Sequence, residues 1–510
     1  MLPSLRPTRR AILASAAALP FLHHAARAER APGSLIFGLS TYPPNIQPWA
    51  NTGTSSATVK LLIFRPLLSY GPDGKLRGEL AESWQRDGDT AWVFKLREAV
   101  FQNGAPVTAG DVKWTIEQVA GEKSTAYLRA EFQTVQEVQT PDPRTVRIVM
   151  KQPTVTLPFW MASFHMPIIA QGSTDNGGTA IGAGPFKLTA QERGVSLDLV
   201  AFDKYYKPGL PKLKSLRITV YADENLRAAA LQAGDVDLIE YVPWQSMQAI
   251  SADPRLKLDG TNGPFMELLF NGKSTQFADA RVRRAVALAI RREDIVKTAF
   301  FGRGAVLEGL PLAPASEFFD AARSKMWHYD PDRAKSLLKE AGFGSGFSST
   351  LLATAQYSMH KTTAEVVQQH LAEIGIQVQL NLPDWSTRVA IGNRGQYEFA
   401  VQGTAADNND PDSLSPIIDG TLSPSYARSI NLPIPKLHEL LAAGRSEFDL
   451  AKRRAIYAEI EKVAGDEVPM IGLAWRSQAY AMAKDVTGFH NLPGALTFYS
   501  GITFEETAIG

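Results

Sequence analysis

Cysteine is absent from this chain. Its absence excludes disulfide bonds, thiol nucleophiles, zinc–thiolate sites and iron–sulfur clusters. It also excludes a lipid anchor on an N-terminal cysteine, so we expect a soluble protein that is not lipid-anchored. A chain of 510 residues can bury a core that is stable without disulfides.

Histidine is scarce as well, with eight residues in the whole chain. Beyond the N-terminal segment there remain only His165, His328, His360, His370, His438 and His490. No two of them have the spacing of a helical or zinc-finger metal site. We therefore expect no metal and no cofactor, although distant histidines could still meet in the folded chain.

Patterns typical of enzymes are missing too. Neither the G-x-S-x-G turn of serine hydrolases nor a glycine-rich phosphate-binding loop occurs. Ser336 with Lys339, and Ser358 with Lys361, match S-x-x-K. The S-D-N and K-T-G elements that such a hydrolase also needs are absent. The sequence thus gives no positive indication of an enzyme.

Long apolar runs are lacking beyond the N-terminus, where no uncharged stretch reaches the ~18 residues of a membrane-spanning helix. At the N-terminus, Arg9 and Arg10 close a basic segment, and an apolar stretch covers residues 11–22. An A-x-A cleavage site at residues 26–28 follows, so residues 1–28 are predicted to be a signal peptide. The paired arginines favour the twin-arginine route, although general secretory signals also carry such pairs. We expect a periplasmic protein without direct membrane insertion.

Charge of one sign does not dominate. The chain has 53 basic and 52 acidic residues, and cleavage after Ala28 would remove four arginines and leave a net charge of −3. A mildly acidic protein is not expected to bind nucleic acid or an anionic membrane. The content of 45% hydrophobic and 21% charged residues is that of a globular protein, and the length allows two to four domains.

Hydrophobic periodicity predicts a mixture of strands and helices. Strands are expected at 35–40, 91–96, 144–150, 195–202, 376–380 and 397–402. Helices are expected at 109–120 with Thr108 as N-cap, at 281–300, at 331–341 between Asp330 and Gly342, and at 363–376. The recurring order of helix and strand indicates an α/β fold. Two turn-rich segments, 259–265 and 484–494, are candidate linkers, and the alternative is that both are ordinary surface turns.

Four stretches resemble the oligopeptide- and dipeptide-binding proteins of bacterial importers, known as extracellular solute-binding protein family 5. In 71–117 the matching residues are Leu80, Ala81, Ser83, Trp84, Phe94, Leu96, Arg97, Val100, Phe101, Asn103, Gly104, Pro106, Thr108, Ala109, Asp111 and Val112. The others are 182-GAGPFKL-188, 231-LQAGDVDLI-239 and 270–296. In the last, Arg291 stands where the family usually has Asp or Asn. The resemblance covers nearly the whole chain after the signal peptide.

The resemblance implies the two-lobed periplasmic-binding-protein fold (type II, cluster C), in which a hinge closes the lobes over a ligand. It places lobe I at 29–51, 182–265 and 485–510, a small inserted domain at 52–181, and lobe II at 266–484. The candidate linkers then fall where the chain crosses between lobes. The implied partners are a peptide or small-molecule ligand and an ABC permease complex in the inner membrane, with the protein itself a monomer.

The segment 405-AADNNDPDSL-414 is rich in Asp and Asn. It is not a calcium loop, because Asp412 occupies the position that requires glycine and a proline interrupts the loop. Asp407 follows the carboxyl end of the strand 397–402, where ligands bind in open α/β sheets. The alternative interpretation is an Asx-rich turn that caps the next helix.

The family has W-x-x-D-x-x-D-P at this place, and Asp407, Asp410 and Pro411 match it. The resemblance implies that Asp407 pairs with the α-ammonium of a peptide. Thr404 replaces the family's tryptophan, which leaves the ligand class open: a peptide or peptide-like cation, or a nickel chelate, haem, oligosaccharide or opine. An exported hydrolase is the remote alternative.

Three further residues are candidates for the ligand site. Trp385 matches a family tryptophan that faces the cleft, where it could offer apolar area and stacking, and its alternative role is core packing. Tyr42 follows the first strand, and Asn271 could hydrogen-bond the backbone of a ligand or end a strand. The predicted ligand-binding residues are therefore Asp407, Trp385, Tyr42 and Asn271.

Overall fold

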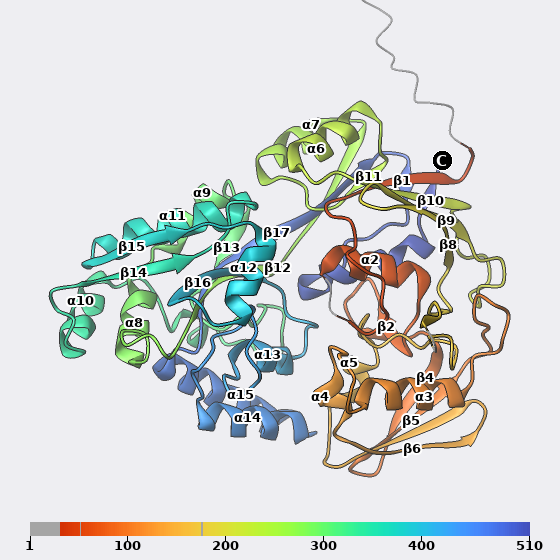
Figure 1. The fold of residues 1–510 in the computed structure, drawn as a ribbon, viewed down its shortest axis with the longest axis horizontal. Helices are drawn as coiled ribbons and strands as arrows, with labels where there is room; N and C mark the ends of the chain where they lie inside the picture. The colour runs from red at the N-terminus through yellow and green to blue at the C-terminus, as the bar shows by residue number, and fades with distance from the viewer. Residues whose placement is uncertain (1–30, 51–52, 175–176) are drawn as a thin grey trace, which may run out of the picture.

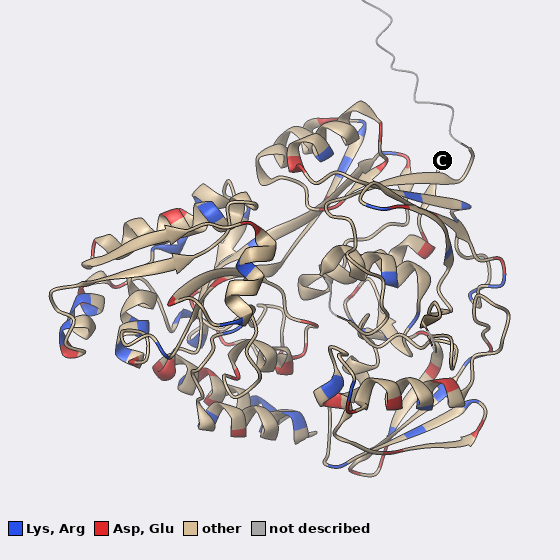
Figure 2. Cartoon of the chain, viewed as in Figure 1, with Lys and Arg blue, Asp and Glu red and all other residues tan. Residues whose placement is uncertain are grey.

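The computed structural model describes residues 31–50, 53–174 and 177–510. The predicted signal peptide lies outside the described residues. The chain forms two lobes joined by long strands (Figure 1). Acidic and basic positions are interspersed over both lobes (Figure 2). No helix in the described part of the chain is long and apolar enough to pass through a lipid bilayer.

A large mixed sheet runs through both lobes in the order β15-β14-β16-β12-β17-β11-β1-β10-β9-β8, with β13 paired to β17. On the side of lobe I its strands are β1 (Ser34–Leu39), β8 (Phe186–Glu192), β9 (Ser196–Ala201), β10 (Ser215–Val220) and β11 (Leu238–Ile239). On the side of lobe II they are β13 (Gly304–Val306), β14 (Phe347–Leu352), β15 (Ile376–Asn381) and β16 (Phe399–Thr404). The α/β class predicted from the sequence is confirmed.

The two lobes are connected by β12 (Leu256–Phe270) and β17 (Ile471–Ala483), which pair in antiparallel register along most of their length. The candidate linker 259–265 is therefore not a turn but the middle of β12, because pairing with β17 outweighs its local turn propensity. The register is irregular between Asn262 and Phe265. The predicted lobe boundary after residue 265 falls inside this strand, and the lobe limits stay a prediction.

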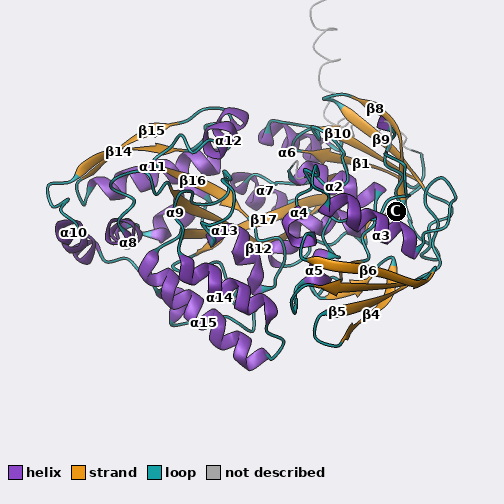
Figure 3. Cartoon of the chain, turned by 60° about the horizontal axis from the view of Figure 1, so that its bottom comes forward, coloured by secondary structure: helices purple, strands orange, loops and turns teal. Residues whose placement is uncertain are grey.

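A second, four-stranded sheet belongs to the segment predicted as an inserted domain. Its order is β4-β5-β7-β6, and Figure 3 shows it apart from the large sheet. The strands are β4 (Ala81–Asp87), β5 (Ala91–Leu96), β6 (Val135–Asp142) and β7 (Thr145–Met150), and the short pair β2 (Leu68–Tyr70) and β3 (Leu76–Gly78) lies beside them in sequence. The helices of this segment are α2 (Thr54–Ile63), α3 (Ala109–Ala120), α4 (Arg129–Phe132) and α5 (Leu157–Trp160). Thr108 caps α3 as predicted, within a capping box with Asp111.

The remaining helices belong to the two lobes. In lobe I they are α6 (Glu224–Ala233), α7 (Met247–Ala252) and the 3-10 helices Trp244–Ser246 and Gly494–Glu505, the last followed by β19 (Ala508–Ile509), which pairs with β18 (Val486–Thr487). In lobe II they are α8 (Ala280–Ala289), α9 (Arg292–Ala299), α10 (Pro331–Glu340), α11 (Ser358–Ala372), α12 (Trp385–Asn393), α13 (Ser415–Ile418), α14 (Pro435–Ser446), α15 (Leu450–Glu467) and the 3-10 helices Arg323–Lys325 and Pro411–Leu414.

The single helix predicted at 281–300 is wrong, because the chain is extended at Ile290 and Arg291 between α8 and α9. The buried guanidinium of Arg292 explains the break. It donates to the carbonyls of Ile290 and Trp327, at 3.2 and 2.8 Å, and so ties the end of α8 to a distant loop. No local sequence pattern predicts such a tertiary contact.

Candidate functional site

The loop after β16 is held by two ion pairs from lobe II. The guanidinium of Arg453, on α15, donates two hydrogen bonds of 2.8 and 2.6 Å to Asp410, and both side chains are buried. Asp410 also caps the 3-10 helix Pro411–Leu414 by accepting from the backbone N–H of Asp412. Arg445 pairs with Asp412 at 3.0 Å. Asp410 therefore fits the interpretation of this segment as an Asx-rich turn that caps a helix. Asp407 takes no part in these contacts.

Asp407 faces lobe I from the beginning of this loop. Its carboxylate accepts one hydrogen bond, 2.9 Å long, from the hydroxyl of Tyr127. Burial raises the pKa of Asp407, against the opposing effect of that hydrogen bond. Among the described residues no Lys, Arg or His forms an ion pair with it. A carboxylate in this setting is costly to ionise unless a cation approaches.

Aromatic side chains of lobe I surround this carboxylate. Burial and the negative charge of Asp407 together raise the pKa values of Tyr127, Tyr70 and Tyr499, so all three rings lie in its field. The rings of Tyr70 and Tyr499 pack edge to face at 5.3 Å. A carboxylate among aromatic rings is suited to a cationic group, which gains both charge pairing and cation–π attraction.

The lobes touch one another at several points. Besides the Tyr127–Asp407 bond, the backbone N–H of Val155 donates to the carbonyl of Arg445 at 2.9 Å. Ser358 Oγ donates to Glu224 at 3.3 Å. These contacts join residues on opposite sides of the predicted cleft, so the chain is in a closed arrangement.

Replacing Tyr127 with Phe is expected to shift the lobes toward an open arrangement. The variant loses one hydrogen bond between lobes, worth about 1 kcal/mol, which lowers the closed-to-open ratio about fivefold. Small-angle X-ray scattering should then give a larger radius of gyration. An unchanged scattering curve, with melting unchanged, would show that this bond does not contribute to closure.

Trp385, at the first turn of α12, belongs to an aromatic group in lobe II. Its ring packs against Tyr357, His360 and Tyr426, with centroids 5.5, 5.6 and 5.8 Å away. The guanidinium of Arg388 lies 5.5 Å from the centre of the Trp385 ring. Trp385 is only partly buried, so this ring both packs within the lobe and keeps an accessible face.

Next to this aromatic group lies a cluster of buried charges that the sequence analysis did not single out. It consists of Glu267 on β12, Arg388 on α12 and Arg476 on β17, which are 0, 1 and 2% exposed. Both arginines act electrostatically on Glu267 and on His360, so the cluster is continuous. Tyr241 of lobe I interacts with Arg476 and places lobe I beside it.

These charged groups do not neutralise one another directly. In the part of the chain that the structure describes, neither oxygen of Glu267 has a hydrogen-bond partner, and Nε of Arg388 and of Arg476 has none. No ion pair within 4.0 Å joins Glu267 to either arginine among the described residues. Leaving such groups unsatisfied costs roughly 1–3 kcal/mol each. The cluster therefore lowers the stability of the fold, which indicates a role in function.

Burial shifts the protonation of all three groups against their charged forms. It raises the pKa of Glu267 well above its ordinary value, although Arg388 and Arg476 act in the opposite direction. Burial lowers the pKa of Arg388 to about 10 and also lowers that of Arg476. Groups perturbed together in this way are typical of functional sites.

A sequence signal for these residues existed. Glu267 interrupts the apolar run 264-PFMELLF-270, and Arg476 interrupts 471-IGLAWRSQAYAMA-483. A charge inside an apolar strand must find a partner or serve a function. Arg388, in an ordinary amphipathic helix, gave no such signal, and only the fold brings it to the other two.

The two other predicted residues occupy different places. The hydroxyl of Tyr42 donates to Gln191 of β8 at 3.3 Å, on the side of lobe I. The amide of Asn271 donates to the carbonyls of Gly395 and Tyr397, both at 3.0 Å, and its oxygen accepts from Asn431. These contacts favour a structural role for Asn271 at the end of β12. No described contact joins either residue to Asp407 or Trp385.

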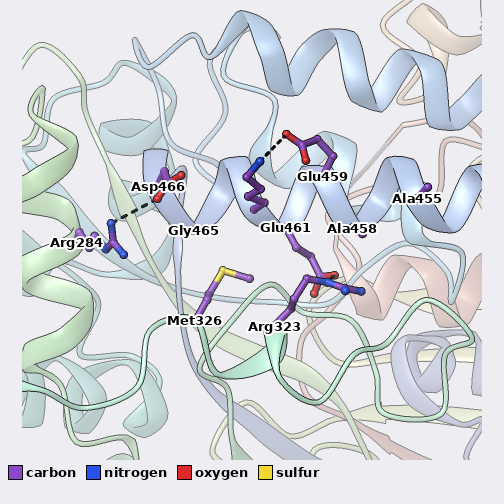
Figure 4. Close-up of a pocket in the computed structure, with 10 residues that line it drawn as sticks. Arg284, Arg323, Met326, Ala455, Ala458, Glu459, Glu461, Gly465 and Asp466 are labelled. Carbon is purple, nitrogen blue, oxygen red and sulfur yellow. Dashed lines mark hydrogen bonds and ion pairs between the residues drawn. The ribbon is translucent and has the colours of Figure 1, made fainter.

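A pocket of about 680 Å³ lies elsewhere (Figure 4). It is on the surface of lobe II, between α15, Arg284 of α8 and the 3-10 helix Arg323–Lys325. Its charges are already paired, as Arg284 with Asp466 at 3.4 Å and Arg323 with Glu461 at 2.5 Å. A smaller cavity of about 30 Å³ lies between the lobes beside Asp410, lined also by Phe265 and Trp475.

Among the described residues, no group of three or more His, Asp or Glu side chains is placed so that it could hold a metal ion. An aromatic residue does occur next to Thr404, on the neighbouring strand. Phe265 lies opposite Thr404 in the sheet, and its ring packs edge to face on Trp475 at 5.7 Å.

Comparisons with known proteins agree on one family. The sequence model described as bacterial extracellular solute-binding proteins, family 5 (middle), matches residues 75–422. The glutathione-binding protein GsiB of Escherichia coli K12 is 28% identical over 476 residues, which are 90% of this chain and 91% of that protein.

Solved structures extend the likeness to the fold. The periplasmic binding protein AgaA of A. tumefaciens R10, in complex with agropinic acid, is 38% identical with a TM-score of 0.88, covering 94% of this chain and 99% of that one. DppA of Helicobacter pylori, in complex with the peptide STSA, is 21% identical with a TM-score of 0.83, covering 94% and 98%. The two-lobed binding-protein fold is thereby confirmed.

Proposed function

Because this chain belongs to family 5 of the bacterial extracellular solute-binding proteins, we propose that it captures peptides or peptide-like cationic solutes for an ABC permease in the inner membrane. Proteins of this family bind solutes for ABC importers, and its members are periplasmic. In our proposal the chain works as a monomeric receptor in the periplasm and not as an enzyme. Its lobes close over the ligand and present it to the permease.

The observation that carries this proposal is Asp407. Its carboxylate lies between the lobes, accepts a single hydrogen bond from Tyr127 and stands among tyrosine rings. An ammonium group placed there would ionise the carboxylate and strengthen the contact between lobes. Closure and ligand binding are then the same event, which is what a transport receptor requires.

A second ligand class is favoured by a different observation. AgaA, the solved relative at 38% identity, was determined with agropinic acid. An acid brings a carboxylate, and the buried cluster at Arg388 and Arg476 offers two cations. An opine or another non-peptide acid is therefore the alternative ligand.

A thermal-shift screen separates these classes. The panel contains di- to octapeptides with their N-acetylated forms, glutathione, agropinic acid, nickel with small chelators, haem and oligosaccharides. A ligand at about 100 times its dissociation constant adds roughly 2.7 kcal/mol of stability, which gives a clear rise in melting temperature. If only a non-peptide class raises it, the peptide assignment is wrong. If no compound does, the receptor function is contradicted.

Replacing Asp407 with Ala is expected to abolish binding of ligands with a free amino group while the protein stays folded. Loss of a charge-assisted contact between buried groups should weaken binding at least 100-fold in calorimetry. Tyr127→Phe is the matched control, since it removes the same hydrogen bond between lobes but keeps the carboxylate, and we expect only about a fivefold loss. Equal losses in both variants would assign Asp407 to closure rather than to the ligand.

A further inference from the structure

The buried charges at the crossing of β12 and β17 define a second site for the ligand. We propose that Arg388 and Arg476 bind a carboxylate of the transported solute, with Glu267 accepting from a polar hydrogen of the same molecule. This inference rests on the proposed transport function and specifies its substrate class. The solute is then an acid, either an acidic opine or, with a cationic group at Asp407, a zwitterion.

The position of Arg388 supports this role. Its Nη2 donates to the carbonyl of Val401 at 2.8 Å, and Nη1 donates to that of Tyr426 at 3.1 Å. These bonds and the flanking rings of Trp385 and Tyr426 fix the plane of the guanidinium. Its Nε remains unpartnered within the described part of the chain and is available to a ligand. A guanidinium held in this way is preorganised for a planar carboxylate.

Arg476 approaches the same region from the connecting strands. Its Nη1 contacts the sulfur of Met359 at 2.9 Å, a weak acceptor that leaves the positive charge uncompensated. Nε is again without a partner among the described residues. Because both arginines affect Glu267 and His360 electrostatically, they lie around one shared region. His360 is buried with a lowered pKa, so it adds no charge there.

The charges of the cluster favour an anionic group on the ligand. Two guanidinium groups face one carboxyl group, Glu267, whose ionisation is itself opposed by burial. Lobe I contributes from the opposite side through Tyr241, whose hydroxyl lies 3.5 Å from Thr54 Oγ1 at the first turn of α2. The N-terminal end of a helix carries partial positive charge, which adds to the preference for an anion.

Two separate anchors would also restrict the ligand. Asp407 contacts Tyr127, and no contact among the described residues joins it to Arg388 or Arg476. A ligand that reaches both must carry its cationic and anionic groups at opposite ends. A ligand that reaches only the arginines must be an acid, and such a ligand needs no amino group. The two cases are separated by modifying each end of the ligand in turn.

The experiment uses calorimetry on the full protein with agropinic acid, glutathione and the dipeptide Met-Leu as probes. Each probe is paired with a form whose carboxylate is blocked as a methyl ester or amide. We expect at least one acid to bind, and blocking its carboxylate to weaken binding at least 100-fold. In Arg388→Gln and Arg476→Gln the acid should bind at least 100-fold more weakly, whereas the blocked form should lose little. That selective loss identifies the carboxylate as the group recognised.

The controls separate folding from recognition. Arg284→Gln removes an exposed arginine at the outer pocket of lobe II and should leave binding unchanged. Arg388→Lys and Arg476→Lys keep the charge, so they test the site if a glutamine variant fails to fold. Equal affinity of acid and blocked forms for the unaltered protein overturns this inference, while the transport function stands. Absence of binding by every acid also overturns this inference, and the transport function is contradicted only if no compound of the thermal-shift panel binds either.

Discussion

Replacing Arg65 with Met is expected to destabilise the protein by about 3–5 kcal/mol, the typical result of removing one partner from a buried ion pair. Arg65 is fully buried, and its guanidinium lies 3.2 Å from Glu79 and 2.9 Å from Glu505. Lys207 and the hydroxyl of Tyr205 complete the group, at 2.6 Å each from Glu505. Without Arg65, the two buried carboxylates keep only Lys207 and the partly exposed Arg77 as cationic partners.

Urea unfolding followed by tryptophan fluorescence measures this effect. Arg77→Met is the matched control, because Arg77 contacts the same Glu505 at 3.4 Å but is partly exposed, and we expect it to cost less than about 1 kcal/mol. If both variants lose a similar free energy of unfolding, burial does not determine how much these ion pairs contribute to stability. Because Glu505 belongs to the C-terminal 3-10 helix, the network also joins the chain end to the segment around β2 and β3.

The same network predicts sensitivity to acid. Burial alone would raise the pKa of Glu79, but Lys207 and Arg65 outweigh it and hold that pKa well below its ordinary value. A carboxyl group with a lowered pKa stabilises the fold above its unfolded pKa of about 4.3 and loses that contribution as the pH falls. The difference in stability between the unaltered protein and Arg65→Met should therefore shrink below about pH 4.

Replacing Glu267 with Gln is expected to stabilise the protein at neutral pH, by roughly 1–3 kcal/mol. Burial raises the pKa of Glu267 well above normal, so the folded state holds this proton more tightly than the unfolded state. Ionisation therefore opposes folding as the pH rises, and glutamine avoids it. The advantage of the variant should disappear below about pH 4, where the unfolded chain is also protonated.

Melting temperatures between pH 4 and pH 8 measure this gain. Glu398→Gln is the comparison, because Glu398 accepts hydrogen bonds from Ser349 and Thr350 at 3.1 and 2.6 Å, and no gain is expected there. The Glu267 variant should at the same time bind the transported acid less well, since activity and stability often oppose one another at such sites. A melting temperature lowered at every pH would mean that Glu267 is needed to balance its two arginines.

Much of the architecture could be predicted from local sequence. The strand at 91–96 and the Thr108 cap of α3 are present as expected, and Asp330 caps α10 by accepting from the backbone N–H of Arg333. Each depends on residues that are neighbours in the chain. The family pattern likewise led to Asp407, because it is a contiguous motif at the end of a strand.

The structure of the lobe crossing, and the meeting of the three charged residues, could be known only from the tertiary structure. The segment 259–265 has the composition of a turn, yet it is a strand because β17, more than 200 residues later, supplies its hydrogen bonds. Glu267, Arg388 and Arg476 come from three elements that meet only in the fold. The sequence by itself determined many of the elements, several of their caps and the family, and it predicted Asp407 as the anchor. The tertiary structure decided which charges are buried together, because burial and long-range pairing depend on distances in space that no local pattern encodes.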